Sequence, residues 1–128
     1  MDLSARVAAL KAVLDAMPGA TIVARSPPRS TKGPMALDYK VMGKTFAILQ
    51  VRGAERVILK CDPHLVEILK EQYAGVGHRS HLDRRYWICI SLDADVPADE
   101  TARLAAQSYD LVRAGLTKTQ RAELEKSG

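Results

Sequence analysis

Residues 37–61 read LDYKVMGKTFAILQVRGAERVILKC, and this stretch decides the fold class. It contains three runs rich in aliphatic and β-branched residues, separated by the glycine-containing dipeptides Met42-Gly43 and Arg52-Gly53. Short runs joined by tight glycine turns are typical of an antiparallel meander. The stretch therefore predicts three consecutive strands, over Leu37–Val41, Lys44–Val51 and Arg56–Cys61.

A first helix is predicted ahead of the meander. Either Asp2 or Ser4 can cap its start, and Pro18-Gly19 ends it. Three prolines, one glycine and three bases follow within residues 25–34 and predict a positively charged loop. The buried stripe of the helix, at helical spacing, is Leu3, Val7, Leu10, Leu14 and Met17.

Three more helices and one strand are predicted after the meander. Asp62-Pro63 supplies an N-cap and a first turn for the second helix, which the glycines of residues 75–77 end. Residues 86–92 predict a fourth strand, with Tyr86, Ile88, Ile90 and Leu92 on one face and Trp87 and Cys89 on the other. Pro97 begins a third helix, and Thr117–Gln120 fits a capping box for the last one. The buried stripe of the second helix is predicted to be Leu65, Ile68, Leu69 and Tyr73.

The order α-β-β-β-α-β-α-α predicts the α+β fold class, as an antiparallel sheet with helices on one face. The length of 128 residues is typical of one domain, so residues 1–128 are expected to form a single domain. A hydrophobic content of 47% and a charged content of 27% are typical of a globular chain. We expect it to be a monomer.

The N-terminal residues contain no basic region followed by an apolar run, which argues against a secretory signal. No run approaches the roughly 20 apolar residues of a membrane span, so no membrane contact is expected. The two cysteines, Cys61 and Cys89, lie in predicted strands and are expected to be free, buried thiols. Together these features predict a cytoplasmic protein.

Charge is unevenly distributed along the chain. Residues 1–60 carry ten Lys or Arg against four Asp or Glu, whereas residues 61–128 carry nine against eleven. A basic half favours an acidic partner such as DNA, although a solvated face is the common meaning of such a surplus. The candidate phosphate-binding residues are Arg25, Arg29 and Lys32 in the loop, Lys44 and Arg52 at the hairpin ends, and Arg84 and Arg85 before the fourth strand.

No catalytic constellation is found, so an enzyme is not expected and no cofactor is predicted. A nucleophile elbow, a Walker pattern and a dinucleotide loop are all missing. The acids Asp93, Asp95, Asp99 and Glu100 are interpreted as helix-start residues rather than catalytic carboxylates. A metal site could be assembled only from Cys61, His64, His78 and His81, and their placement at element ends and in a loop argues against it.

The segment His81–Trp87 is the densest candidate for recognition, because it combines a histidine, two arginines and two aromatic residues. Arginine binds phosphate and aromatic rings stack on bases. His81 and Trp87 are the ligand-binding candidates here. The alternative is that Trp87 is a buried structural residue, and for that reading we predict substantial burial.

Several short motifs resemble the YjbR (MmcQ-like) family of small bacterial proteins. They are Met17-Pro-Gly-Ala20, Met42-Gly-Lys-Thr-Phe-Ala47, Lys60-Cys-Asp-Pro63, His81-Leu82 followed by Trp87, Ser108-Tyr-Asp-Leu-Val112, Gly115-Leu116 and Arg121. The resemblance implies a frataxin-like (CyaY-like) sandwich, for which a double-wing similarity to a DNA-binding domain has been suggested. It implies no catalytic residues. Relatives place Asn-Lys where Asp83-Arg84 stand here, and a Trp-Gly-x-Pro segment near Thr31–Pro34.

Two functions therefore remain open. One is non-specific DNA binding through the basic residues above. The other is a non-catalytic module that binds a protein or a small molecule with its sheet face and the His81–Trp87 segment.

Overall fold

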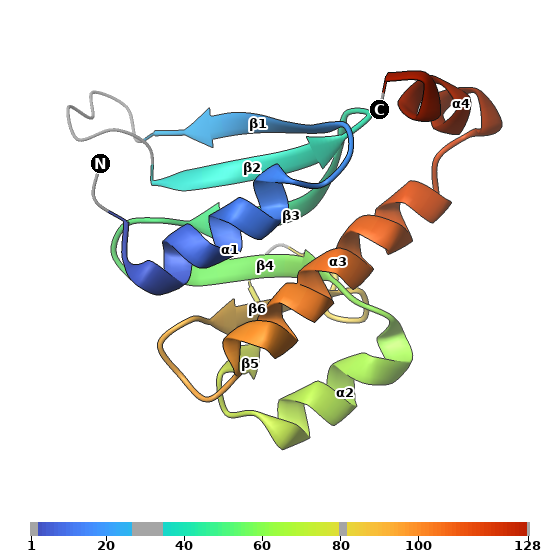
Figure 1. Ribbon diagram of the computed structural model, residues 1–128. Helices are drawn as coiled ribbons and strands as arrows, with labels where there is room; N and C mark the ends of the chain where they lie inside the picture. Colours follow the sequence, from blue (N-terminus) through green and yellow to red (C-terminus); the bar gives the residue numbers. More distant parts are fainter. Residues whose placement is uncertain (1–2, 27–34, 80–81, 128) are drawn as a thin grey trace.

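The computed structural model describes residues 3–26, 35–79 and 82–127. Within these residues six strands form one antiparallel sheet, in the order β1-β2-β3-β4-β6-β5 (Figure 1). The strands are β1 (Ala20–Arg25), β2 (Ala36–Val41), β3 (Lys44–Gln50), β4 (Arg56–Lys60), β5 (Val76–Gly77) and β6 (Trp87–Ser91).

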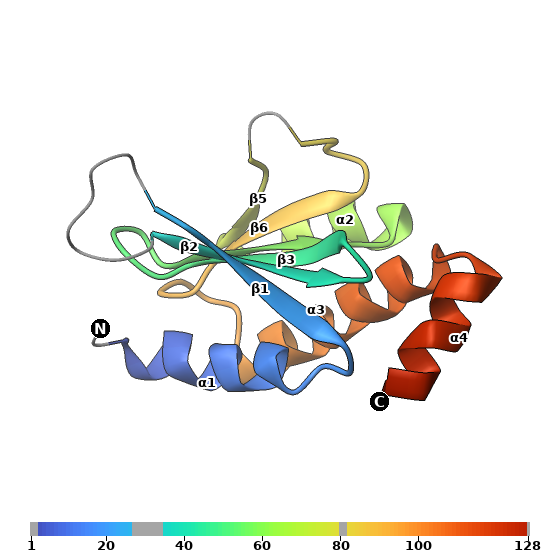
Figure 2. The same cartoon turned by 90° about the horizontal axis from the view of Figure 1, so that it is seen from above.

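Four helices accompany the sheet in the described residues. Two of them, α1 and α3, lie against the same face, and no described helix covers the opposite face (Figure 2). The second helix, α2, lies beside the β5 edge, and α4 follows α3 at the far end of the molecule (Figure 1). The helices are α1 (Ala5–Asp15), α2 (Pro63–Gln72), α3 (Ala98–Ala114) and α4 (Lys118–Ser127).

The predicted meander is confirmed as β2, β3 and β4. Met42 and Gly43 form the β2–β3 turn with φ values of 49° and 80°. Two consecutive residues with positive φ give the turn whose twist matches a hairpin, and glycine adopts that conformation without strain. The α+β class is therefore confirmed, with two strands more than the four that the sequence predicts.

The helix caps lie where the sequence places them. The hydroxyl oxygen of Ser4 accepts a hydrogen bond from the Val7 amide at 3.2 Å, and Asp62 Oδ1 accepts one from the His64 amide at 2.8 Å. Before α4, Thr117 and Gln120 exchange two side chain–backbone hydrogen bonds, at 3.0 and 3.1 Å. These contacts involve near neighbours in the chain, which explains why the sequence predicts them.

The predicted stripe of α2 is wrong at one position. Ile68 is 56% exposed, whereas Val66 and Leu69 are buried in the core. Because α2 packs beside the short β5 edge rather than across the sheet, only one narrow side of this helix is covered.

Aromatic residues from the sheet and α3 fill the core. The Phe46 ring packs against Tyr39 at 6.1 Å and against Tyr109 at 5.3 Å between ring centroids, the latter edge to face. The Tyr109 hydroxyl donates to the Pro18 carbonyl oxygen at 2.5 Å, and the Tyr39 hydroxyl donates to Asp15 Oδ1 at 2.6 Å. These contacts join the C-terminal end of α1 and the turn that follows it to the rest of the core.

Candidate nucleic-acid interface

Strand register assigns alternate residues to the two faces of the sheet. One set belongs to the core beneath α1 and α3, and the other set lies on the opposite side, which we call the helix-free face. Its residues are Thr21, Val23 and Arg25 of β1, Ala36, Asp38 and Lys40 of β2, Thr45, Ile48 and Gln50 of β3, Arg56, Ile58 and Lys60 of β4, Gly77 of β5, and Trp87, Cys89 and Ser91 of β6.

The helix-free face is basic. Arg25 and Arg56 lie in one row across the sheet, three strand spacings or about 14 Å apart. Lys60 lies four residues along β4 from Arg56, or about 13 Å, and Lys40 belongs to the row nearer Lys60. The four side chains are exposed or half-buried, so they present cations over an area that several phosphates can share.

A single carboxylate, Asp38, lies among the described strand residues of this face. Its side chain is 1% exposed, and it accepts hydrogen bonds from Arg25 Nη2 at 2.5 Å and from the Thr45 hydroxyl at 2.9 Å. The Asp38 carboxylate offsets the charge of Arg25, whose side chain is 59% exposed, so the surplus positive charge of this face comes from Lys40, Arg56 and Lys60. The exposed character of the face is therefore positive.

Apart from Asp38, the middle row of the helix-free face is apolar, and it includes Ile58 and Cys89, both buried. Burial raises the pKa of the Cys89 thiol, and the nearby guanidinium groups of Arg56 and Arg79 oppose that rise. Arg79 follows β5 and lies close enough to influence Cys89, which belongs to the helix-free face. It therefore adds a further base to this side of the molecule.

A pocket of about 460 Å³ opens at the end of the sheet where β4 stops and β6 starts. Residues 60–63, residues 83–87 and Leu111 of α3 contribute to its walls. A hydrogen bond from the Cys61 amide to the Tyr86 carbonyl oxygen at 2.7 Å joins the first two segments. We call it the Trp87 pocket; it is lined by Lys60, Cys61, Asp62, Pro63, Asp83, Tyr86, Trp87 and Leu111.

A turn over residues 83–86 fixes the aromatic wall of this pocket. The amides of Tyr86 and Trp87 both donate to the Asp83 carbonyl oxygen, at 3.1 and 3.0 Å. The Asp83 carboxylate accepts from the Arg85 guanidinium at 3.0 and 3.2 Å, which holds the pKa of Asp83 below its usual range. The Arg85 guanidinium in turn lies 5.3 Å from the centroid of the Tyr86 ring.

Trp87 is half-buried, which agrees with the predicted substantial burial, but it is not part of the core. It lines the pocket, while its neighbours Ile88 and Ile90 occupy the core. The reason is that Trp87 lies on the helix-free face, where no described helix covers it.

The structure separates the hairpin candidates. Lys44 Nζ donates to the Gly115 carbonyl oxygen at 3.3 Å, so this side chain extends toward α3. Arg52 follows the other end of β3, and a strand of that length spans about 24 Å. Arg84 and Arg85 are exposed beside the Trp87 pocket. The candidates Arg29, Lys32 and His81 lie outside the described residues.

The sequence did not predict which basic residues share the helix-free face. Lys40, Lys60 and Arg79 were missed, Arg25 was assigned to the loop, and Arg56 was considered only as a hairpin base. The missing signal is strand register, because only the ladder shows that basic residues on β1, β2 and β4 share one side.

The described residues contain no group of three His, Cys, Asp or Glu side chains that could hold a metal ion. Both cysteines are free and buried, as predicted. Burial raises the pKa of Cys61 to about 11, so its thiol is protonated at neutral pH and is not an activated nucleophile.

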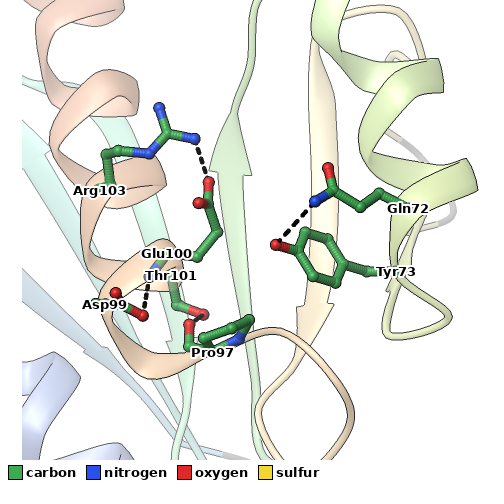
Figure 3. A network of polar contacts seen from close by, with 7 residues as sticks. All are labelled: Gln72, Tyr73, Pro97, Asp99, Glu100, Thr101 and Arg103. Atoms are coloured by element: carbon green, nitrogen blue, oxygen red, sulfur yellow. Dashed lines mark hydrogen bonds and ion pairs between the residues drawn. The ribbon is translucent and has the colours of Figure 1, made fainter.

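The acids before and at the start of α3 have structural partners. Asp95 accepts from the amides of Ala74 and Gly75, at 2.8 and 2.7 Å. Asp99 accepts from the Glu100 amide at 3.0 Å, and Glu100 pairs with Arg103 one turn along the helix (Figure 3). Figure 3 also shows Gln72 donating to the Tyr73 hydroxyl at the end of α2. Asp99 and Glu100 thus lie in the first turn of α3 as predicted, whereas Asp95 instead holds the α2–β5 connection.

None of the helices in the described part of the chain is long and apolar enough to cross a membrane. The geometry defines a small α+β protein in which the described helices cover one face of a single sheet and leave the opposite, basic face open. The chain belongs to the YjbR family, whose family model matches residues 15–111. The matched range includes the whole sheet, α2 and most of α3.

Two curated relatives come from Escherichia coli, strains K12 and O157:H7, and both carry the name "Uncharacterized protein YjbR". Each is 32% identical to this chain over 75 residues. The alignment covers 58% of this chain and 64% of each relative, slightly less than two thirds of their length.

Two crystal structures are similar to this fold. A Deinococcus radiodurans protein with a DUF419 domain superposes with a TM-score of 0.74 and 29% identity, over 91% of this chain and 85% of that chain. A Pseudomonas syringae protein superposes with a TM-score of 0.54 and 22% identity, over 66% of this chain and 83% of that one, which is a likeness of fold alone.

Proposed function

We propose that this protein is a non-catalytic DNA-binding protein that holds DNA by its phosphates, with the helix-free face as the contact surface. The observation that carries the proposal is the placement of Arg25, Lys40, Arg56 and Lys60 on one face whose one carboxylate among the described strand residues is buried. Lysine and arginine side chains that replace condensed counterions supply most of the affinity in non-specific DNA binding.

Low sequence specificity follows from the same geometry. Reading base edges in the major groove requires an inserted helix or ribbon that presents side chains such as Asn, Gln or Arg. The described elements place no helix on the helix-free side, and Gln50 is the one amide side chain among its strand residues. Contacts to phosphates position DNA without reading its sequence.

The frataxin-like, double-wing arrangement implied by the family resemblance would use hairpin tips as wings. The β2–β3 and β3–β4 turns lie at opposite ends of β3, so Lys44 and Arg52 do not share one contact patch. We therefore propose that the sheet face is the main contact. Arg52 borders it at one end and Arg84 and Arg85 border it at the other, while Lys44 lies outside it.

A charge-neutralising pair of variants tests the proposal. Arg56→Gln with Lys60→Gln should weaken binding to every DNA sequence tested by about tenfold or more, because two phosphate contacts are lost. The matched control is Lys118→Gln with Arg121→Gln, which removes the same charge from exposed positions on α4. Fluorescence anisotropy of labelled DNA at low salt measures both. Equal loss in the two double variants would contradict the proposed surface.

A second candidate function is the binding of a free small molecule, and the observation that favours it is the Trp87 pocket. Its volume of about 460 Å³ and its mixture of aromatic, apolar and charged walls fit a small-ligand site. A thermal shift with small metabolites, in the absence of any DNA binding at low salt, would favour this candidate over the first.

A further inference from the structure

We propose that the Trp87 pocket receives an unpaired nucleobase, so that the protein binds single-stranded DNA more tightly than duplex. This inference rests on the proposed function and adds to it the form of DNA that is preferred. The starting point is that the pocket and the helix-free face share two residues, Lys60 and Trp87, which are partners across β4 and β6.

That shared edge gives a path for the nucleic acid. Lys60 is both the last basic residue of β4 and part of the pocket wall. A DNA strand whose phosphates lie along the lysine and arginine side chains of the helix-free face thus reaches Lys60 at the pocket mouth. The nucleobase attached to the next sugar can then turn inward against Trp87.

The pocket walls suit a flat, uncharged ring. Trp87 is half-buried and Tyr86 is 39% exposed, so both aromatic rings retain accessible surface. Leu111 of α3 adds an apolar side chain to the lining. Stacking of bases on aromatic side chains is a main source of affinity for single strands and tolerates any base.

The carboxylate of Asp62 favours entry of the base over entry of the phosphate. Asp62 and Asp83 both line the pocket, but Arg85 offsets the charge of Asp83. Asp62 therefore supplies most of the repulsion of a phosphate, and its side chain can accept a hydrogen bond from a base N–H group. The base therefore enters, and the phosphate stays outside near Lys60. A base in a duplex remains stacked and paired, and extracting it costs free energy that a single strand does not require.

The single tryptophan of the chain makes the test direct, because all tryptophan emission comes from Trp87. A mixed-sequence single strand of about 20 nucleotides should quench this emission as it binds. An abasic strand of the same length carries the same phosphates, so it should bind in a salt-dependent manner and leave the emission nearly unchanged. A duplex should bind about tenfold more weakly than the base-containing strand.

Three variants distinguish a loss of base stacking from a loss of the folded structure. Trp87→Phe retains an aromatic ring and should bind single strands nearly as the wild type does, whereas Trp87→Ala should bind them about tenfold more weakly. Tyr86→Ala removes an exposed ring outside the core and should also weaken single-strand binding more than duplex binding. Anisotropy of labelled DNA measures all three, and circular dichroism checks that each variant is folded.

The outcomes distinguish the base-binding pocket from the proposed DNA binding by the helix-free face. Equal affinity for base-containing and abasic strands, with unchanged Trp87 emission, overturns the base pocket and leaves the helix-free face as the DNA surface. No binding of any DNA at low salt overturns both. Quenching by free mononucleotides without any binding of strands also overturns the inference, in favour of a small-molecule site.

Discussion

The hydroxyl group of Ser108 closes a gap in the sheet. The ladder between β3 and β4 stops at the pair Ala47 and Leu59. Beyond it, Ser108 Oγ donates to the Phe46 carbonyl oxygen at 2.6 Å and accepts from the Lys60 amide at 2.8 Å. This fully buried side chain from α3 thus satisfies two backbone groups that the strands no longer satisfy for each other.

We predict that Ser108→Ala lowers the free energy of unfolding by about 1–3 kcal/mol, because it leaves two buried backbone groups without a partner. Urea denaturation measures the change. Ser26→Ala, at an exposed position after β1, is the control and should alter stability by less than about 0.5 kcal/mol. Equal stability of the two variants would show that water or a shift of the strands replaces the hydroxyl group.

A second prediction concerns pH and Cys61. Burial raises the pKa of this thiol from 9.0 to about 11. Above pH 9 the unfolded chain loses the thiol proton while the folded chain keeps it, so the free energy of unfolding falls as pH rises from about 9 to about 11. Urea denaturation of wild type and Cys61→Ala at pH 8 and at alkaline pH tests this. The variant should lose less stability over that interval, and an identical loss would contradict the assignment.

Predictability differs among single residues for a physical reason. Asp62 could be assigned as an N-cap because its partner amide lies two residues away. Ser108 could be assigned only to the inner side of its helix, since its partners are 48 and 62 residues distant. Trp87 was misplaced because alternation shows which strand face a residue occupies, whereas burial depends on what covers that face.

At the scale of elements, the contact between α4 and the α1–β1 turn depends on one glycine. Gly19 has a φ of +73°, and a Cβ atom there would lie 2.1 Å from Leu124 Cδ1. Among the α4 side chains that the structure describes, Leu124 is the one within the buried core, so this contact holds the last helix. A side chain at position 19 would therefore force α4 to move as well as strain the turn.

We predict that Gly19→Ala is more destabilising than Gly43→Ala. Gly43 has a φ of +80°, but a Cβ atom added there would have no atom within 4 Å. Backbone strain alone costs about 1–2 kcal/mol in each variant. Gly19→Ala should therefore lose more unfolding free energy than Gly43→Ala, and this additional loss should disappear when Leu124→Ala is also present. A double-mutant cycle by urea denaturation measures it. Additive effects of the two substitutions would mean that the Leu124 side chain turns aside at no cost.

Two strands escaped prediction. The residues of β1 are all exposed except for half-buried Ala20, so no burial alternation marks this edge strand. The two-residue strand β5 is too short to carry a pattern and contains a glycine that otherwise signals a break. The helices and the meander carry long periodic patterns, which explains why they were found.

At the scale of the whole molecule, the fold converts a basic half of the sequence into a basic face. Arg25, Lys40 and Arg56 are far apart along the chain, yet the β1–β4 ladder places all three on the side away from α1 and α3. Composition indicated an acidic partner, but the surface that would meet it depends on register and on which face the helices cover. For that reason the sequence alone could not predict which basic residues share one surface.

The salt dependence of DNA binding tests the central claim most directly. With about four phosphate contacts, the logarithm of the duplex association constant should fall against the logarithm of salt concentration with a slope near −3 to −4. The measurement is fluorescence anisotropy between about 50 and about 200 mM salt. In Arg56→Gln with Lys60→Gln the slope should become shallower by about two. A salt-independent affinity, or the same slope in wild type and double variant, would contradict phosphate binding by the helix-free face.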